Sequence, residues 1–177
     1  DLLTGVSNRN CYIKKLGQLS HGTLHTLGVI YIDINGMKKL NDNFGHEYGD
    51  RVIQNVADIL RARAESNAFR VGGDEFVVIL ENDDFENYEE LLDRFNTALD
   101  DYNRHARPDG RISIARGIAI YEENVDLTVS DVFKRADDAM YQNKIQMKKR
   151  REKADRSGSG SNADLCPDGS TDRNPDR

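Results

Sequence analysis

Apolar residues follow a two-residue period in some parts of the chain and a helical period in others. The run 27–32 (LGVIYI) is almost continuously apolar, as in a central strand covered on both faces, and predicts a strand near 27–33. Two further apolar runs, near 68–71 and 75–80, flank the pair Gly72-Gly73. Because adjacent glycines tolerate the positive φ angles of tight turns, these runs predict a β-hairpin.

The remaining apolar positions predict one more strand and three long helices. Alternating isoleucines predict a strand near 112–121, in which Arg116 falls on the apolar face without a functional interpretation. Helical spacing predicts apolar stripes that begin near Asp50, near Tyr88 and at the capping pattern Thr128–Asp131. The last of these helices is predicted to bury Val132, Phe133, Ala136, Ala139, Met140 and Met147.

Composition limits the class of protein. With 177 residues, of which 37% are hydrophobic, the chain is long enough for one packed domain. A net charge of −6 argues against a general nucleic-acid or membrane-surface binder, because such proteins present a basic face to phosphates. Any phosphate site must therefore be local. Cys11 and Cys166 lie far apart, which supports neither a disulfide framework nor a zinc site and is typical of a reducing compartment.

The two ends of the chain give three further expectations. Beyond residue 156 almost no apolar residues occur, so we expect a domain over residues 1–156 and a disordered tail over 157–177. The start at Asp1, without methionine, suggests a piece of a longer protein. No apolar run is long enough to span a bilayer and no signal peptide is recognisable, so we expect a cytoplasmic location.

Acidic residues lie at two places where predicted strands meet turns. Asp33 follows the central apolar run directly, and Asp74 and Glu75 lie at the hairpin tip. If these segments pair, the carboxylates converge and form an all-oxygen cluster suited to Mg²⁺. On the hairpin alone a solvated turn is the better explanation, because Gly-Gly-Asp is ordinary turn chemistry. Asp33 favours the metal site, because catalytic groups are common at the ends of buried strands.

The segment after Asp33 has features of a phosphate-binding turn. Gly36 allows close backbone approach, and free N–H groups at the start of the next helix attract anions. Lys38 adds a positive charge there, and Asn41 follows on the same helical stretch. His46 is better explained as a structural hydrogen-bonding residue than as a ligand or base.

Four segments carry motifs whose order and spacing are informative. They are DLLTGVSNR (1–9), DINGMKKLNDNFGHEYGD (33–50), RVGGDEF (70–76) and KRADDAMYQNK (134–144). Together they resemble the signature blocks of the GGDEF family, the diguanylate cyclases, and the resemblance covers about residues 1–150. It implies an α/β (α+β) fold like that of nucleotidyl cyclases, with a central, mainly antiparallel sheet flanked by helices.

The resemblance implies an enzyme that condenses two GTP molecules into cyclic di-GMP and two pyrophosphates. Each ribose 3′-oxygen attacks the α-phosphorus of the other nucleotide, so a homodimer would be needed. Two Mg²⁺ ions, with Mn²⁺ as an alternative, would be held by Asp33, Asp74 and the Ile34 carbonyl and would lower the pKa of the attacking hydroxyl. Glu75 is the candidate for the remaining proton or metal role. Family members usually carry an upstream sensor domain, which is the expected partner in a longer, in some cases membrane-bound, protein.

The same resemblance assigns substrate-binding residues. For the phosphates they are Asn35, Gly36, Met37, Lys38, Lys144 and Lys148. For guanine, they are Asn41 and Asp50. A carboxylate suits guanine because the ring N1–H and N2–H₂ groups are adjacent donors, a pair that adenine lacks.

The chain departs from the family pattern at three of these positions. Asn35 stands where many members have a second aspartate, and Met37 where many have phenylalanine; both are tolerable if Met37 contributes its backbone. Lys148 stands where the family typically has arginine. Because an ammonium group cannot make the bidentate fork of a guanidinium, this last change is expected to weaken phosphate binding.

A fourth departure concerns product inhibition. Many family members bind their product through an RxxD motif shortly before the signature. The matching positions here are Arg63, Ala64, Glu65 and Ser66, so the aspartate is replaced by serine. Serine cannot offer two carboxylate oxygens to guanine, and we therefore expect high-affinity product inhibition to be absent unless Glu65 takes that place.

Two other hypotheses compete with catalysis. The first is a silent GGDEF domain that binds GTP as a regulatory or interaction module; such domains commonly lose the signature, whereas all of Gly72 to Phe76 is present. The second is a phosphate-binding structural module without a nucleotide role. It would leave unexplained why Asp33, Asp74 and Glu75 should lie together near Lys38.

Overall fold

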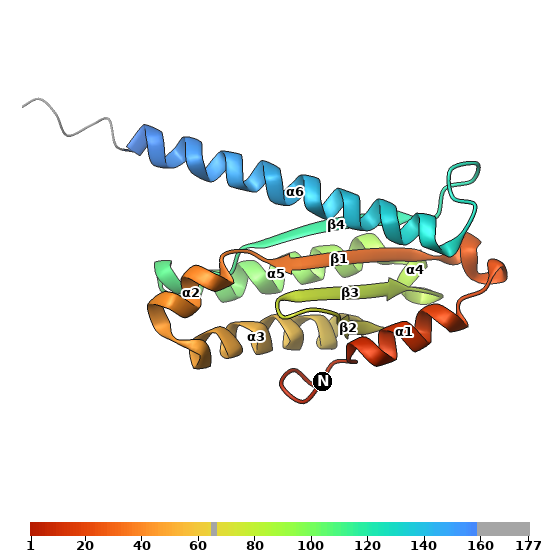
Figure 1. Cartoon of the computed structure of the whole chain (residues 1–177), viewed down its shortest axis with the longest axis horizontal. Helices are drawn as coiled ribbons and strands as arrows, with labels where there is room; N and C mark the ends of the chain where they lie inside the picture. The colour runs from red at the N-terminus through yellow and green to blue at the C-terminus, as the bar shows by residue number, and fades with distance from the viewer. Residues whose placement is uncertain (65–66, 159–177) are drawn as a thin grey trace, which may run out of the picture.

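The computed structural model describes residues 1–64 and 67–158. One antiparallel sheet has the strand order β2-β3-β1-β4. Its strands are β1 (Gly28–Ile34), β2 (Ala68–Arg70), β3 (Glu75–Leu80) and β4 (Ile114–Ile120). The helices are α1 (Arg9–Gln18), α2 (Met37–Phe44), α3 (His46–Ala64), α4 (Asp83–Glu86), α5 (Tyr88–His105) and α6 (Val129–Gly158), with 3₁₀ turns at His21–Thr26 and Pro108–Gly110. The predicted antiparallel sheet flanked by helices is confirmed (Figure 1).

Strand β1 is the centre of the sheet. It pairs with β3 on one side and β4 on the other, and every residue except the half-buried Tyr31 is buried. Both of its faces are therefore covered, which explains why its sequence is continuously apolar instead of alternating. The prediction of a central strand near 27–33 is confirmed to within one residue at each end.

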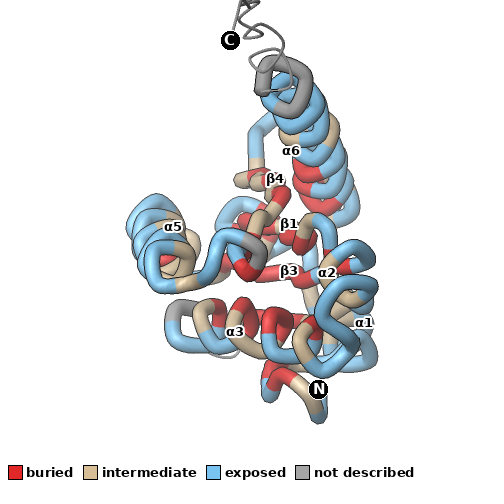
Figure 2. The backbone as a smooth tube through the Cα atoms, turned by 90° about the vertical axis from the view of Figure 1, so that its left-hand side faces the viewer, coloured by how far each residue is buried: buried red, intermediate tan, exposed pale blue. Residues whose placement is uncertain are grey.

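Helices cover the sheet on both sides (Figure 2). On one face, helices α3 and α5 pack through Val52, Val56, Leu60, Leu91 and Phe95 onto Ile30, Ile32, Phe76 and Val78. On the other face, α6 packs through Val132, Phe133 and Ala136, joined by Tyr12 and Leu16 of α1, onto Val29, Val77, Ile79 and Ala119. The sheet thus separates two apolar clusters, and odd-numbered residues of β1 face α6.

Helix α6 approaches the sheet closely at one point. A Cβ atom added to Gly117 of β4 would collide with the backbone carbonyl of Ala136 and the backbone nitrogen of Met140. Glycine therefore sets the distance between helix and strand. The prediction that Ala139 is buried is wrong: this side chain points away from the sheet and is exposed, while Met147 is only half-buried because the helix has passed the sheet edge there.

A partly buried ion pair fixes the segment that leads into α6. Arg135 donates from Nε to Asp126 Oδ1 at 2.8 Å and from Nη2 to Asp126 Oδ2 at 2.5 Å, and also to the Ile120 carbonyl at 2.6 Å. The hydrogen bond from Arg135 is the main reason that the pKa of Asp126 lies below its ordinary value. The backbone N–H of Glu122 donates to the same carboxylate at 2.8 Å.

The predicted cap of α6 is confirmed. Asp131 Oδ2 accepts from the backbone nitrogen of Thr128 at 2.8 Å and from its hydroxyl at 2.9 Å. These hydrogen bonds lower the pKa of the Asp131 carboxyl. A carboxylate in the first turn also suits the positive end of the helix dipole.

The structure changes two other sequence-based expectations and leaves a third untested. Helix α3 begins at His46, four residues before the predicted start near Asp50. Arg116, which had no interpretation, hydrogen-bonds to Asn96 of α5 and so connects β4 to that helix. The predicted tail falls almost wholly outside the described residues.

Over residues 1–64 and 67–158, no helix has the length and apolar character needed to cross a membrane.

Candidate active site

Backbone pairing brings the acidic segments together. Asp33 lies opposite Glu75 in the register of β1 and β3. The Ile34 N–H donates to the Asp74 carbonyl at 3.0 Å. Figure 1 shows the β2–β3 turn, the end of β1 and α2 at the same end of the sheet, with α6 passing over it. The strand pairing on which the carboxylate hypothesis depended is therefore present.

Asp33 is a buried carboxylate with one free oxygen. The residue is 3% exposed, and Oδ2 accepts a hydrogen bond from Lys144 Nζ at 2.6 Å. Oδ1 is buried and has no hydrogen-bond partner among the described residues. A buried, unsatisfied carboxylate oxygen is costly, because it has lost its water without gaining a donor. The site therefore favours the approach of a further cation or proton donor.

Glu75 does not join Asp33 in a closed cluster. As cross-strand neighbours, the two acids share the face that looks toward α6, where like charges opposite each other are unfavourable. The Glu75 carboxylate folds back over Gly72, so closely that a Cβ on Gly72 would collide with it. In the described part of the chain, no group of three or more His, Cys, Asp or Glu side chains is placed to hold a metal ion.

The chain's oxygen donors nevertheless fit a hard divalent cation at one position. The free Oδ1 of Asp33 is buried, and the backbone hydrogen bond from Ile34 to Asp74 brings the next residue of β1 to the hairpin tip. Carboxylate and carbonyl oxygens are the ligands that Mg²⁺ prefers, and Mg²⁺ commonly uses one or two carboxylates with the remaining positions filled by water and substrate phosphate. Two acids and a carbonyl suit that mode, although they do not suit an all-protein cage.

Arg70 holds the backbone of the hairpin tip. Its Nε and Nη2 donate to the Gly73 carbonyl at 3.2 and 2.8 Å. Its Nη1 also pairs with Asp1 Oδ1 at 3.0 Å, and the same oxygen accepts from the Thr4 hydroxyl at 2.8 Å. The first and third motifs are thus linked by one guanidinium, which positions Asp74 through its neighbour Gly73.

The turn after β1 is fixed by two hydrogen bonds to Ser113. The backbone N–H of Asn35 donates to the Ser113 carbonyl at 2.8 Å, and Asn35 Nδ2 donates to Ser113 Oγ at 3.3 Å. Gly36 then takes a φ of 77°, which favours glycine, and α2 begins at the next residue. The unpaired N–H groups of the first helical turn are an anion site. The asparagine that departs from the family pattern therefore has a structural role in this turn.

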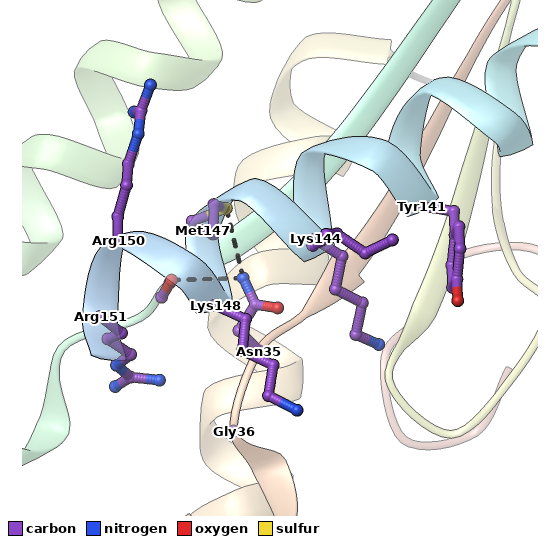
Figure 3. A pocket seen from close by; sticks show the side chains of 10 residues that line it. Asn35, Gly36, Tyr141, Lys144, Met147, Lys148, Arg150 and Arg151 are labelled. Carbon is purple, nitrogen blue, oxygen red and sulfur yellow. Dashed lines mark hydrogen bonds between the residues drawn. The ribbon is translucent and has the colours of Figure 1, made fainter. Parts of the chain in front are cut away.

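A cavity of about 790 Å³ lies between this turn and α6. Its lining includes Asn35, Gly36 and Ser113 from the sheet end, and Lys144 and Lys148 from α6. Figure 3 shows the side chains of both lysines extending from α6 on the side where Gly36 lies. Four of the predicted phosphate-binding residues, Asn35, Gly36, Lys144 and Lys148, are therefore brought to one cavity from distant parts of the chain.

A second cavity, of about 410 Å³, lies on the other side of the turn. Among the predicted residues it is lined by Met37, Lys38, Asn41 and Asp74. His46 and Arg70, which the sequence did not assign to a site, line it as well. The two cavities flank the Asn35–Met37 turn, and Lys38 is thus separated from Lys144 and Lys148.

Asn41 is poised beside the start of α3. Its Oδ1 is buried without a hydrogen-bond partner in the described part of the chain. A Cβ on Gly49 would collide with that oxygen, so glycine at this position makes room for the amide. Asp50 follows directly and is exposed. The two predicted guanine-binding residues are neighbours, although Asp50 lines neither of the two cavities.

The prediction about product binding falls on residues 63–66, which lie partly outside the described residues. Glu65 and Ser66 lie outside the described residues, and so does the side chain of Arg63. The expectation that high-affinity product inhibition is absent therefore remains a prediction.

A four-stranded antiparallel sheet with helices on both faces and an acidic hairpin beside the central strand is the arrangement expected of a nucleotidyl-cyclase-like domain. The family model described as "Diguanylate cyclase, GGDEF domain" matches residues 1–150. The chain therefore belongs to the GGDEF family, as its motifs predicted.

Curated relatives share about a third of their aligned residues with this chain. It is 33% identical over 151 residues to the probable diguanylate cyclase DgcT of Escherichia coli K12, covering 81% of this chain and 33% of that protein. It is 32% identical to the diguanylate cyclase DgcS of Shewanella oneidensis, covering 81% of this chain and 49% of that protein. The cyclic di-GMP phosphodiesterase PdeR of Escherichia coli K12 is 31% identical over 80% of this chain and 22% of its own length. The chain thus spans at most about half of these relatives, and they differ in activity.

Solved structures agree with the fold. The GGDEF domain of DgcB from Caulobacter crescentus, in complex with c-di-GMP, superposes with a TM-score of 0.70 at 26% identity, over 82% of this chain and 87% of that one. The GGDEF domain of PA1120 from Pseudomonas aeruginosa gives a TM-score of 0.65 at 30% identity, over 82% and 88% of the two chains.

Proposed function

We propose that this chain is an active diguanylate cyclase domain. It condenses two GTP molecules into cyclic di-GMP with release of two pyrophosphates, it depends on Mg²⁺, and it works as a homodimer. The observation that carries the proposal is Asp33, a buried carboxylate with a free oxygen beside an intact Gly72–Phe76 signature. A buried carboxylate oxygen without a donor is costly to keep, and a cation needed for the reaction would offset that cost.

Phosphate binding falls to backbone and lysine groups. The N–H groups that open α2, together with Lys38, Lys144 and Lys148, would receive the triphosphate from two sides of the Asn35–Met37 turn. Asn41 and Asp50 would pair with the guanine edge. These contacts hold the α-phosphorus near the end of β1, where attack by the 3′-oxygen of the second nucleotide requires it.

Lys144 has two roles in this proposal. Without substrate it neutralises Asp33 through the 2.6 Å ion pair. Its side chain is 46% exposed, so the ammonium can turn from Asp33 to an incoming phosphate without leaving a packed position. Asp33 is then released with both oxygens available. The exchange couples substrate arrival to the opening of the cation site.

Asp33, Asp74 and the Ile34 carbonyl would hold Mg²⁺. When bound, the ion would neutralise charge on the phosphoryl oxygens and lower the pKa of the attacking hydroxyl. Glu75 lies across from Asp33 in the sheet register and is the candidate to accept the proton of that hydroxyl. A second copy of the domain must supply the other nucleotide, because the reaction joins two of them head to tail.

The direct test is product formation from GTP and Mg²⁺ at several protein concentrations. We expect cyclic di-GMP to appear and the rate per domain to rise with concentration, since dimers are the reacting species. Asp74→Asn, which keeps the shape and removes the charge, should lower turnover by on the order of 10² to 10³. A rate per domain independent of concentration across the monomer range would contradict the dimer, and full turnover in Asp74→Asn would contradict the role of this acid.

Base selection tests the guanine assignment separately. A pocket built to pair polar edges rejects ligands that leave those edges unpaired, so GTP should bind more tightly than ATP. Competition binding measures the preference in the unaltered chain and in Asp50→Ala. Equal affinity for both nucleotides would remove Asn41 and Asp50 from the site.

The second candidate is a silent domain that binds GTP and signals to a partner. The observation that favours this candidate is the similar protein named as a phosphodiesterase, whose name assigns it no cyclase activity. It predicts GTP binding without product at any protein concentration. Because GTP is available in the cytoplasm, we expect either kind of domain to act there. The expected regulatory partner is an upstream sensor domain in a longer protein.

A further inference from the structure

The exposed part of α6 carries three cations on one face. Lys148 follows Lys144 by four residues and Arg151 follows Lys148 by three, so successive side chains lie one turn apart on the same side of the helix. All three line the 790 Å³ cavity beside the Asn35–Gly36 turn. Arg150 also lines the cavity, but Figure 3 shows its side chain extending in the opposite direction from that of Arg151. Of the two adjacent arginines, Arg151 therefore belongs to the lysine face.

Arg151 reaches the turn that opens α2. Its Nη1 lies 3.8 Å from the position that a Cβ would occupy on Gly36. Gly36 has no side chain to separate the guanidinium from the backbone, and the first-turn N–H groups of α2 begin at the next residue. A guanidinium and an N-terminal helical turn thus face the same space, and both attract anions.

Two of these three cations have no ion-pair partner among the described residues. Lys144 is paired with Asp33, but neither Lys148 nor Arg151 forms an ion pair in the part of the chain that the structure describes. Two positive side chains and a helix N-terminus repel each other unless an anion lies between them. The arrangement therefore favours a multiply charged ligand such as a nucleoside triphosphate.

We propose that Arg151 binds the terminal phosphates of the substrate and supplies the guanidinium that position 148 lacks. The expected loss of a bidentate phosphate contact at Lys148 is then compensated one turn farther along the same helix. The inference rests on the proposed function, because it assigns a residue to the same triphosphate site. It depends on α6 continuing as a helix to Arg151, which the structure shows.

The test is nucleotide binding, measured by calorimetry with guanosine 5′-(α,β-methylene)triphosphate and with GMP. The methylene bridge blocks cleavage at the α-phosphorus, so affinity is measured without turnover. Arg151→Ala should lower the affinity for the triphosphate by about tenfold and change GMP binding by less than about twofold. Arg151→Lys keeps the charge without the fork and should fall between. Lys149→Ala, an exposed charge that does not line the cavity, should leave both affinities within about twofold of the unaltered chain.

Each possible result either supports or overturns the assignment of Arg151 to the phosphate site. If the unaltered chain binds the triphosphate and Arg151→Ala binds it equally well, the inference is wrong while the proposed function stands. Equal losses in Arg151→Ala and Lys149→Ala, or an equal loss for GMP, would show a general field effect and would also overturn it. If the unaltered chain does not bind the triphosphate, the proposed function fails and the inference fails with it. Circular dichroism checks that each variant retains its helices.

Discussion

The two halves of α6 are held in different ways. In the packed half (129–140), Val132, Phe133, Ala136 and Met140 are buried against the sheet, and the Asp126–Arg135 pair fixes the approach. In the exposed half (141–158), every described residue through 154 is exposed or half-buried, and Figure 1 shows the helix running past the sheet. Packing thus determines residue identity in the first half and places few limits on the second.

This difference bears on the site, because Lys144 is the first cation beyond the packed half. It lies one turn after Met140, whose side chain is 8% exposed. The packed half therefore fixes the height of α6 over Asp33, while the described side chains that follow are exposed or half-buried. If the chain binds a triphosphate as proposed, the packed half supplies the fixed support on which the charged residues are carried.

The largest expected effect on stability is at the closest contact of the packed half. Gly117→Ala places a methyl group against two backbone atoms of α6, which cannot rotate away as a side chain could. We expect a loss of about 3 kcal/mol in the free energy of unfolding, at the upper end of the usual cost of overpacking. Urea denaturation measures it. Gly17→Ala in α1 is the control, because a Cβ there meets no described atom within 4 Å and should be neutral or stabilising by up to about 1 kcal/mol.

The ion pair that leads into the packed half should have the next largest effect. Asp126→Asn keeps the shape of the side chain but leaves Arg135 with only its longer ion pair, to Glu122 Oε2 at 3.8 Å. Removing one partner of a buried pair costs about 3 to 5 kcal/mol, and we expect about 2 kcal/mol because the Arg135 side chain is 33% exposed and can recruit water. Glu123→Gln, in the same loop and exposed, should change stability by less than about 0.5 kcal/mol. Equal losses of unfolding free energy in both variants would show that any charge change in this loop destabilises the fold and that the Asp126–Arg135 pair has no special contribution.

The same pair predicts how stability depends on pH. Arg135 lowers the pKa of Asp126 in the folded state, so the unfolded chain binds the proton more readily. The contribution of this carboxylate is therefore complete above about pH 4 and is lost as the pH falls through the lowered folded pKa. Asp131, whose pKa is also lowered, is present in both proteins and cancels in the comparison. The difference in unfolding free energy between the unaltered chain and Asp126→Asn should thus shrink below pH 4. A constant difference down to pH 3 would show that the charge of Asp126 is not the stabilising feature.

Local patterns predicted the packed regions well. The continuous apolar run of β1, the pairing of the two strands beside Gly72-Gly73 and the Thr128–Asp131 cap depend on neighbouring residues, and the structure confirms all three. The turn of the hairpin differs from the prediction: it spans the four residues 71–74, and the described glycines with a positive φ are Gly5, Gly36 and Gly45, not Gly72 or Gly73. The start of α3 was missed because Gly45, at a φ of 83°, ends α2 and lets a new helix begin at once, which no apolar period signals. Ala139 was misassigned because alanine is small enough for either face of a helix.

The contacts of the site could be predicted only in part. The motifs indicated which residues to consider, but the pairing of Lys144 with Asp33 joins residues 111 positions apart and depends on the path of α6 over the sheet. The hydrogen bonds between Asn35 and Ser113 depend in the same way on the register of β1 and β4. The predicted three-acid cluster did not allow for Glu75 folding back over Gly72. The spacing of residues in the sequence determines which face of a helix or strand a side chain occupies. Which residues then come into contact depends on how the helices and strands cross.

The smallest expected effect on stability is at Lys148 in the exposed half. Its side chain contacts no carboxylate among the described residues, so Lys148→Ala should change the free energy of unfolding by less than about 0.5 kcal/mol. The same substitution should weaken binding of the non-cleavable GTP analogue, because it removes a charge from the cavity between α6 and the Gly36 turn.

Lys148→Arg sharpens the comparison of the two halves. It restores the guanidinium of the family pattern without altering packing, so stability should again stay within about 0.5 kcal/mol. Affinity for the analogue should rise by a few-fold, since a planar fork can contact phosphate through two N–H groups while an ammonium acts as a point charge. If Arg151 already fills this place, the gain should be larger in the Arg151→Ala background than in the unaltered chain, which a double-mutant cycle measures. Equal gains in both backgrounds would show that the two positions act independently, and a loss of stability in Lys148→Arg would show that packing constrains the exposed half after all.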